Sequence, residues 1–188
     1  MTAQAAETFR FSLPSGDPWA ASEAASDLYR LGANPTLAPL AWVSNHYRWI
    51  VWKLACLTRR FDSRLPPDFG FDRDTVLRQL CYRYEREINQ NQRSSVKMLV
   101  ERDDLSTRHM ILCVCALNVK PQSSDNTSSV FIEVTDGWYS VHAMLDDSLS
   151  DLLRRGKIFV GLKLRLYGAQ VRSSVLEFAR IRKKLIGD

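Results

Sequence analysis

The sequence predicts an α+β protein, with an all-helical domain at residues 1–104 and a small five-stranded β-barrel at residues 105–188. Apolar residues recur at helical spacing in the first region and at every second position in the second. The change of period comes at the polar run ERDDLSTR, residues 101–108. A chain of 188 residues is long enough for two small domains, so this run marks the predicted boundary.

Two short helices are predicted first. One spans residues 19–31 and stops at Gly32. After a stretch with two prolines, a second helix contains Trp42–Ala55, WVSNHYRWIVWKLA, which holds three tryptophans. Because this helix is apolar on nearly every side, it must be buried on several sides. Core packing is therefore the first interpretation of Trp42 and Trp49, and a partner surface is the alternative.

A long amphipathic helix is predicted from Arg73 to Glu101, with Asp72 or Asp74 as its N-cap. Its inward stripe consists of Val76, Leu77, Leu80, Cys81, Tyr84, Ile88, Ser95, Met98 and Leu99. Its other face carries Arg78, Arg83, Arg86, Arg93 and Lys97. An ordinary solvated face is the simplest interpretation of these charges.

The strands follow. They are predicted at residues 109–118, 130–135, 138–145, 157–171 and 174–181, with a short helix ended by Gly156 before the last two. This order of elements is typical of an oligonucleotide-binding (OB) barrel, although SH3-like and other small barrels give similar patterns. In the fourth strand, Val160, Leu162, Leu164 and Leu166 point inward, and Lys163, Arg165 and Tyr167 point outward.

The dipeptide Asp136-Gly137 predicts a two-residue type I′ hairpin loop in which Thr135 pairs with Trp138. The core face of this hairpin then contains Ile132, Val134, Tyr139, Val141, Ala143 and Leu145. The opposite face contains Phe131, Glu133, Trp138, Ser140 and His142. Asp136 is expected to have a structural role, because its carboxylate can bond backbone amides around the turn.

Several classes of function are excluded or disfavoured. The three histidines and four cysteines have no metal-site or triad spacing, and no phosphate-binding or nucleophile motif is present, so no enzyme, metal or cofactor is expected. No apolar run is long enough for a membrane span, and the N-terminus has no secretion signal, which predicts an intracellular protein. The net charge of +5 permits binding to nucleic acid or to acidic proteins.

Two binding functions are open. OB barrels bind single strands with aromatic side chains flanked by basic ones. The candidates for DNA binding are Phe131, Arg154, Arg155, Lys157, Lys163 and Arg165. Trp138 is more typical of packing beside the turn. Alternatively, the tryptophans and cations of the second helix have the residue types of protein-binding hot spots, suited to an acidic peptide that carries aromatic residues.

Four segments carry a family resemblance. They are WVSNHYRWIVWKLA, LRQLCYRYEREINQNQRSSVKMLVERDD, EVTDGWYSVHAMLDDSL and GKIFVGLKLRLYGAQV. In this order they resemble the helical domain and first OB domain of the breast cancer type two susceptibility protein family, over residues 38–171. The resemblance implies a fragment or shortened relative of a nuclear, tumour-suppressor protein that mediates homologous recombination. Such proteins load a RecA-like recombinase onto single-stranded DNA at double-strand breaks.

The resemblance also implies a partner. In that family these two domains dock a small, very acidic protein, the deleted in split-hand/split-foot protein, called Sem in yeast. Strong binding of single-stranded DNA belongs to the second and third OB folds. The docking residues implied here are Arg48, Trp49, Lys53, Arg83, Arg86, Lys97, Trp138 and Tyr139. Asp136 and Gly137 are expected to be structural residues of the turn.

Overall fold

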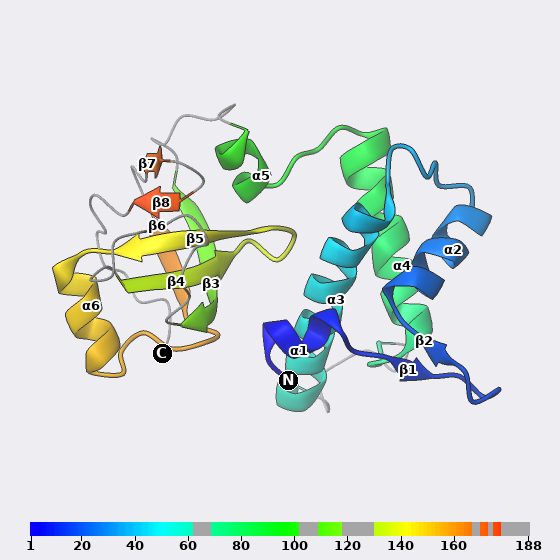
Figure 1. The fold of residues 1–188 in the computed structure, drawn as a ribbon, viewed down its shortest axis with the longest axis horizontal. Helices are drawn as coiled ribbons and strands as arrows, with labels where there is room; N and C mark the ends of the chain where they lie inside the picture. Colours follow the sequence, from blue (N-terminus) through cyan, green and yellow to red (C-terminus); the bar gives the residue numbers. More distant parts are fainter. Residues whose placement is uncertain (62–68, 102–108, 118–129, 167–169, 173–174, 178–188) are drawn as a thin grey trace. The chain divides into compact units, whose positions relative to one another are not determined.

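The computed structural model divides into two compact units, the helical unit Met1–Arg93 and the sheet unit Ser94–Asp188 (Figure 1). It describes residues 1–61, 69–101, 109–117, 130–166, 170–172 and 175–177. The division falls before the predicted boundary between residues 104 and 105. The reason is that Val96 and Leu99 belong to the apolar core of the sheet unit.

The central helix of the helical unit is α3 (Leu40–Phe61), against which α1, α2 and α4 pack (Figure 1). The other elements are α1 (Ala3–Glu7), β1 (Phe11–Ser12), β2 (Pro18–Trp19), α2 (Ala21–Arg30) and α4 (Arg73–Tyr84). As predicted, α2 ends before Gly32, which has a φ of 100°. Asp72 is the N-cap of α4, because its side chain accepts the amide hydrogen of Thr75.

The single helix predicted for residues 73–101 is wrong. After α4 the chain makes a π-helical turn, η2 (Glu85–Asn89), and α5 (Ser95–Val100) is a separate helix of the sheet unit. The break comes at Asn91, whose φ of 51° cannot continue a right-handed helix. Ser94 then starts α5 as its N-cap. The apolar spacing crosses the break, so periodicity alone did not indicate it.

The sheet unit contains one mixed sheet with the strand order β6-β3-β4-β5-β8-β7. Its elements are β3 (Met110–Leu117), β4 (Val130–Thr135), β5 (Ser140–Leu145), α6 (Asp147–Arg154), β6 (Lys163–Leu166), β7 (Gln170–Arg172) and β8 (Val175–Glu177). The pair β5 and β8 is parallel, and the other neighbours are antiparallel. Asp146 caps α6, and Gly156 follows it with a φ of 68°.

A closed barrel of five strands is not what the described residues form, since they give an open series of six strands. The predicted strand at residues 157–171 is divided into β6 and β7. Its first part is a turn, in which Gly161 has a φ of 97° and Val160 is 46% exposed instead of pointing inward. The inward positions of Leu162, Leu164 and Leu166 are confirmed, and Tyr167 lies outside the described residues.

The hairpin β4–β5 has a longer loop than predicted. Thr135 pairs with Ser140 rather than with Trp138, so residues 136–139 form the loop. The register therefore differs by two positions. Because side chains alternate with a period of two, this shift leaves the predicted core face unchanged. The strand residues of that face, such as Ile132 and Val141, are buried.

No helix of the described residues has the length and apolar character needed to cross a membrane.

Candidate functional site

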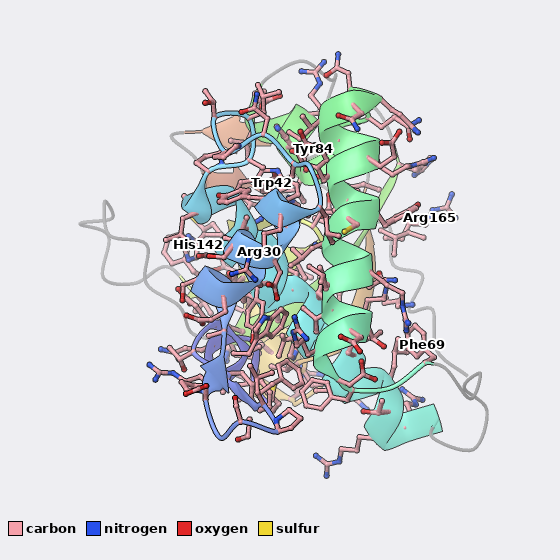
Figure 2. The ribbon with its side chains drawn as sticks, turned by 90° about the vertical axis from the view of Figure 1, so that its right-hand side faces the viewer. Arg30, Trp42, Phe69, Tyr84, His142 and Arg165 are labelled. Atoms are coloured by element: carbon pink, nitrogen blue, oxygen red, sulfur yellow. The ribbon has the colours of Figure 1, made fainter. Side chains whose placement is uncertain are left out.

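The tryptophan-rich helix α3 is first of all a core element. Trp42, Trp49 and Trp52 are each no more than 9% exposed. The indole Nε1 of Trp49 donates to Asn45 Oδ1 at 3.1 Å. The rings of Trp42 and Tyr84, both labelled in Figure 2, meet edge to face between α3 and α4 with centroids 6.3 Å apart. Core packing, the first interpretation of these tryptophans, is confirmed.

Three polar side chains are buried together between α3 and the helical segment formed by α4 and η2. His46 is 0% exposed, and Arg83 and Glu87 are each 3% exposed. Arg83 Nη1 lies 2.9 Å from His46 Nδ1, and His46 Nε2 lies 3.1 Å from Glu87 Oε2. Because a guanidinium can only donate, Nδ1 is the acceptor and Nε2 carries the proton. Nε2 lies close to Glu87 Oε2 without the geometry of a hydrogen bond to it. We call these three residues the buried triad.

The buried triad changes the interpretation of the predicted docking residues. The prediction that Arg83 lies on a solvated face is wrong, and Trp49 is completely buried. Arg48 is half-buried. Its Nε donates to the carbonyl of Ala3 in α1 at 3.1 Å, and its guanidinium carbon lies 4.4 Å from the centroid of the Trp49 ring. These three side chains therefore have intramolecular roles in the helical unit.

Two predicted docking residues of the helical unit reach its surface. Lys53 on α3 is exposed. Desolvation by the surrounding protein lowers the pKa of this lysine, and the positive charge of Arg83 lowers it further. Arg86 is half-buried, and its guanidinium lies 5.8 Å from the centroid of the Tyr82 ring.

Arg86 belongs to a surface stripe on the continuous helical segment formed by α4 and η2. Arg78, Tyr82 and Arg86 are four residues apart, so they lie along one side of the segment. Arg78 is exposed, and Tyr82 is 52% exposed. We call these three residues the α4 stripe. Sequence analysis missed Tyr82, although its spacing from the two arginines was a usable signal.

In the sheet unit, Asp136 joins the hairpin loop to α5. Its Oδ1 accepts the amide hydrogens of Trp138 and Tyr139 at 2.9 and 3.0 Å, and its Oδ2 accepts that of Val96 at 2.8 Å. Gly137 has a φ of 91°. This geometry agrees with the structural role expected for both turn residues.

The same loop brings three predicted docking residues of the sheet unit together. Lys97 Nζ lies 5.6 Å from the centroid of the Tyr139 ring, a distance at which a cation and an aromatic face attract each other. Trp138 and Tyr139 are half-buried. The hydrogen bonds of Asp136 hold the loop and α5 in this arrangement, so Lys97 and Tyr139 form one small surface, and Trp138 precedes Tyr139 in the loop.

Some of the predicted DNA-binding residues are buried or ion-paired, and others are exposed. Phe131 is 5% exposed, so the prediction that it forms an outward stacking platform is wrong. Arg155 Nε lies 2.7 Å from Asp151 Oδ2, and Arg154 Nη1 lies 3.8 Å from Asp151 Oδ1. The single carboxylate of Asp151 therefore offsets at most one of these two positive charges.

Lys157, Lys163 and Arg165 are exposed. Phe159, which is 54% exposed, lies between them in sequence and was missed by sequence analysis. Ile111 pairs with Arg165 across β3 and β6 and is 55% exposed. These five residues, which we call the β6 strip, combine positive charge with exposed apolar surface, and Phe159 provides the aromatic ring that Phe131 does not.

Nothing in the described part of the chain resembles a metal centre, because no three His, Cys, Asp or Glu side chains gather there as ligands. The four cysteines are free thiols. Burial raises the pKa of the Cys56 and Cys81 thiols, which makes them poor nucleophiles.

Two family models match this chain one after the other. Residues 24–91 match the model described as BRCA2, helical, and residues 94–184 match the model described as BRCA2, oligonucleotide/oligosaccharide-binding, domain 1. The matches meet where the structure divides into its two units. The chain belongs to the BRCA2 family. In this family the two domains are binding domains and not enzymatic ones.

Two curated BRCA2 relatives from Arabidopsis thaliana are similar to this chain. They are Protein BREAST CANCER SUSCEPTIBILITY 2 homolog B and homolog A, each 43% identical over 145 residues, which is 73% of this chain. The match spans only 12% of the length of each relative. The similarity therefore concerns the helical and first OB domains of the BRCA2 family.

Proposed function

We propose that this chain is a docking module of a nuclear BRCA2-type mediator of homologous recombination, active in the repair of DNA double-strand breaks. Its helical and first OB domains dock the small acidic deleted in split-hand/split-foot (Sem-type) protein. By doing so they support binding of single-stranded DNA and loading of a RecA-like recombinase by a longer protein. The consecutive family matches support this role.

The charge distribution of the helical unit carries the proposal for an acidic partner. Helix α3, residues 40–61, contains no aspartate or glutamate, and its cations Lys53, Arg59 and Arg60 are exposed. The α4 stripe adds two more cations beside an exposed tyrosine ring. Positive charges steer an acidic chain during encounter, and the ring provides contact area.

The test is a titration of the purified chain with the acidic protein, followed by calorimetry at several salt concentrations. The double variant Arg78→Glu/Arg86→Glu should weaken binding by about tenfold or more, and affinity should fall as salt rises. Arg83 is avoided because its replacement would disturb the buried triad. Arg10→Glu, an exposed control in the same unit, should change affinity by less than about twofold. Equal affinity for the double variant and the wild type would contradict the proposal.

The second candidate function is binding of single-stranded DNA by the sheet unit alone. The β6 strip favours it, because Phe159 can stack on a base while Lys157, Lys163 and Arg165 contact phosphates. Titration with oligo-dT measures the salt slope, about −0.7 for each phosphate neutralised. Tight binding of oligo-dT that is lost in Phe159→Ala, together with no binding of the acidic protein, would reverse the order of the two functions.

A further inference from the structure

The N-terminal helix α1 lies on the central helix α3 (Figure 1). Ala3 and Ala6 are 1% and 0% exposed, whereas Ala5 between them is exposed. Arg48 of α3 donates to the carbonyl of Ala3 at 3.1 Å, and the side chain of Thr2 caps the helix. A face of α3 that contains a predicted docking residue is therefore occupied by the chain itself.

The charged side chains of α3 are all positive. The cations of α3 are Arg48, Lys53, Arg59 and Arg60, and the helix has no carboxylate. The only charged side chain of α1 is Glu7. The hydrogen bond from Arg48 to the Ala3 carbonyl places α1 beside this cationic helix.

The contact that holds α1 on α3 is weak. A helix of five residues is far below the roughly 12 to 15 residues at which isolated helices become stable, so α1 depends on its contact with α3. That contact buries only two small side chains. The next segment is anchored independently, because the Tyr47 hydroxyl donates to the Phe9 carbonyl at 3.0 Å and the Phe9 ring packs against Phe11 and Phe71. Helix α1 can therefore leave while Phe9 stays in place.

We propose that α1 is a built-in competitor for this face of α3, and that the acidic protein displaces it on docking. The face belongs to a helix with four cations and no carboxylate, which suits an acidic partner segment. Residues 1–7 lie outside the region 24–91 that matches the family model, so the competitor is an addition to the matched domain. The inference rests on the proposed function, since it assumes an acidic partner.

The first test is a pair of neutral substitutions in α1. Ala6→Gln places a longer polar side chain at a buried position and should unseat α1, whereas Ala5→Gln at the neighbouring exposed position should not. Neither substitution changes the net charge. Because the apparent dissociation constant is inversely proportional to the fraction of open molecules, Ala6→Gln should bind the acidic protein about tenfold more tightly. Ala5→Gln should bind it like the wild type.

Amide hydrogen exchange gives the second readout. In the free wild type the Ala6 amide, which donates to the Thr2 carbonyl at 3.1 Å, should be protected. Addition of the acidic protein should remove this protection while Tyr47 still holds Phe9. Binding with unchanged protection of residues 1–7, or equal affinity of both variants, would overturn the inference and leave the proposed function standing. Failure of every chain to bind the acidic protein would overturn both.

Discussion

The two units of this chain differ in where their buried polar side chains find partners. The helical unit buries the triad of His46, Arg83 and Glu87 in its interior. The sheet unit also buries polar side chains, Glu133 and Thr135, but their partners lie within the β4–β5 hairpin: Ser140 Oγ donates to Glu133 at 2.7 Å, and Thr135 Oγ1 donates to the Tyr139 carbonyl at 2.6 Å. The carboxylate of Asp136 accepts backbone amides at the hairpin loop. The backbones of two packed helices do not determine which side chains face each other. Strands, in contrast, are aligned by backbone hydrogen bonds. The difference suggests that buried charge aligns α3 with α4.

The largest expected effect comes from breaking the triad. Arg83→Met should destabilise the helical unit by about 3 to 5 kcal/mol, because it leaves Glu87 buried without its compensating cation. Urea denaturation followed by tryptophan fluorescence measures it, since four of the five tryptophans, Trp19, Trp42, Trp49 and Trp52, lie in this unit. Arg86→Met, one turn further along the same helical segment, should cost less than about 1 kcal/mol.

A triple variant sharpens this comparison. His46→Phe, Arg83→Met and Glu87→Leu together should restore most of the lost stability, because a well-packed apolar set of similar volume often equals a buried ionic one. A triple variant as unstable as Arg83→Met would mean that the volume of the site, and not the charge balance, determines the cost.

The second effect concerns the hairpin loop of the sheet unit. Asp136→His should destabilise that unit by about 3 kcal/mol, because three backbone amides lose a charged acceptor. Thermal unfolding and hydrogen exchange in β4 and β5 measure it. Asp147→His, at an exposed position in the same unit, is the matched control. An unchanged melting temperature would count against the structural role of Asp136.

The smallest effect is a pH dependence of the helical unit. Burial by itself raises the pKa of Asp27, but hydrogen bonds from Arg73 at 2.7 Å and Trp19 at 2.9 Å lower it more, so the net shift is downward. A carboxyl with a lowered pKa stabilises the fold above its unfolded value of about 3.9, and this contribution is lost as the pH falls through the folded value.

Asp27→Asn tests that linkage. It should cost about 1 to 2 kcal/mol at pH 7 and progressively less below about pH 4, where the wild type loses the same contribution. Denaturation midpoints measured from pH 7 to pH 2 give the comparison. A constant difference across that range would show that the carboxylate charge is not what stabilises this site.

Much of the architecture could be predicted from local pattern. The all-round apolar surface of residues 42–55 predicted a buried helix, and the pairing of β4 with the alternating strand β5 predicted the core face even though the register was wrong by two. Asp136 could be assigned to the turn from its short side chain and its glycine neighbour. Each of these inferences depends on residues close together in sequence.

The candidate site was less predictable. Arg83 was predicted to be exposed like Arg78. Periodicity alone does not show that His46 of the facing helix lies opposite Arg83. Phe131 was placed outside because alternation assumes a strand with one solvated face, whereas β4 is buried on both. The exposure of Phe159 was not predicted, because this residue lies in a segment that was expected to be a strand.

By itself the sequence determined the family, the two-domain order and the helical or extended state of most segments, because these follow from short-range spacing and from long, specific motifs. Only the tertiary structure decided which cations are buried, which aromatic rings reach solvent and that α1 covers Arg48. Whether a side chain is buried depends on both partners in a contact, and those partners are far apart along the chain, as with Ala3 and Arg48, which are 45 residues apart.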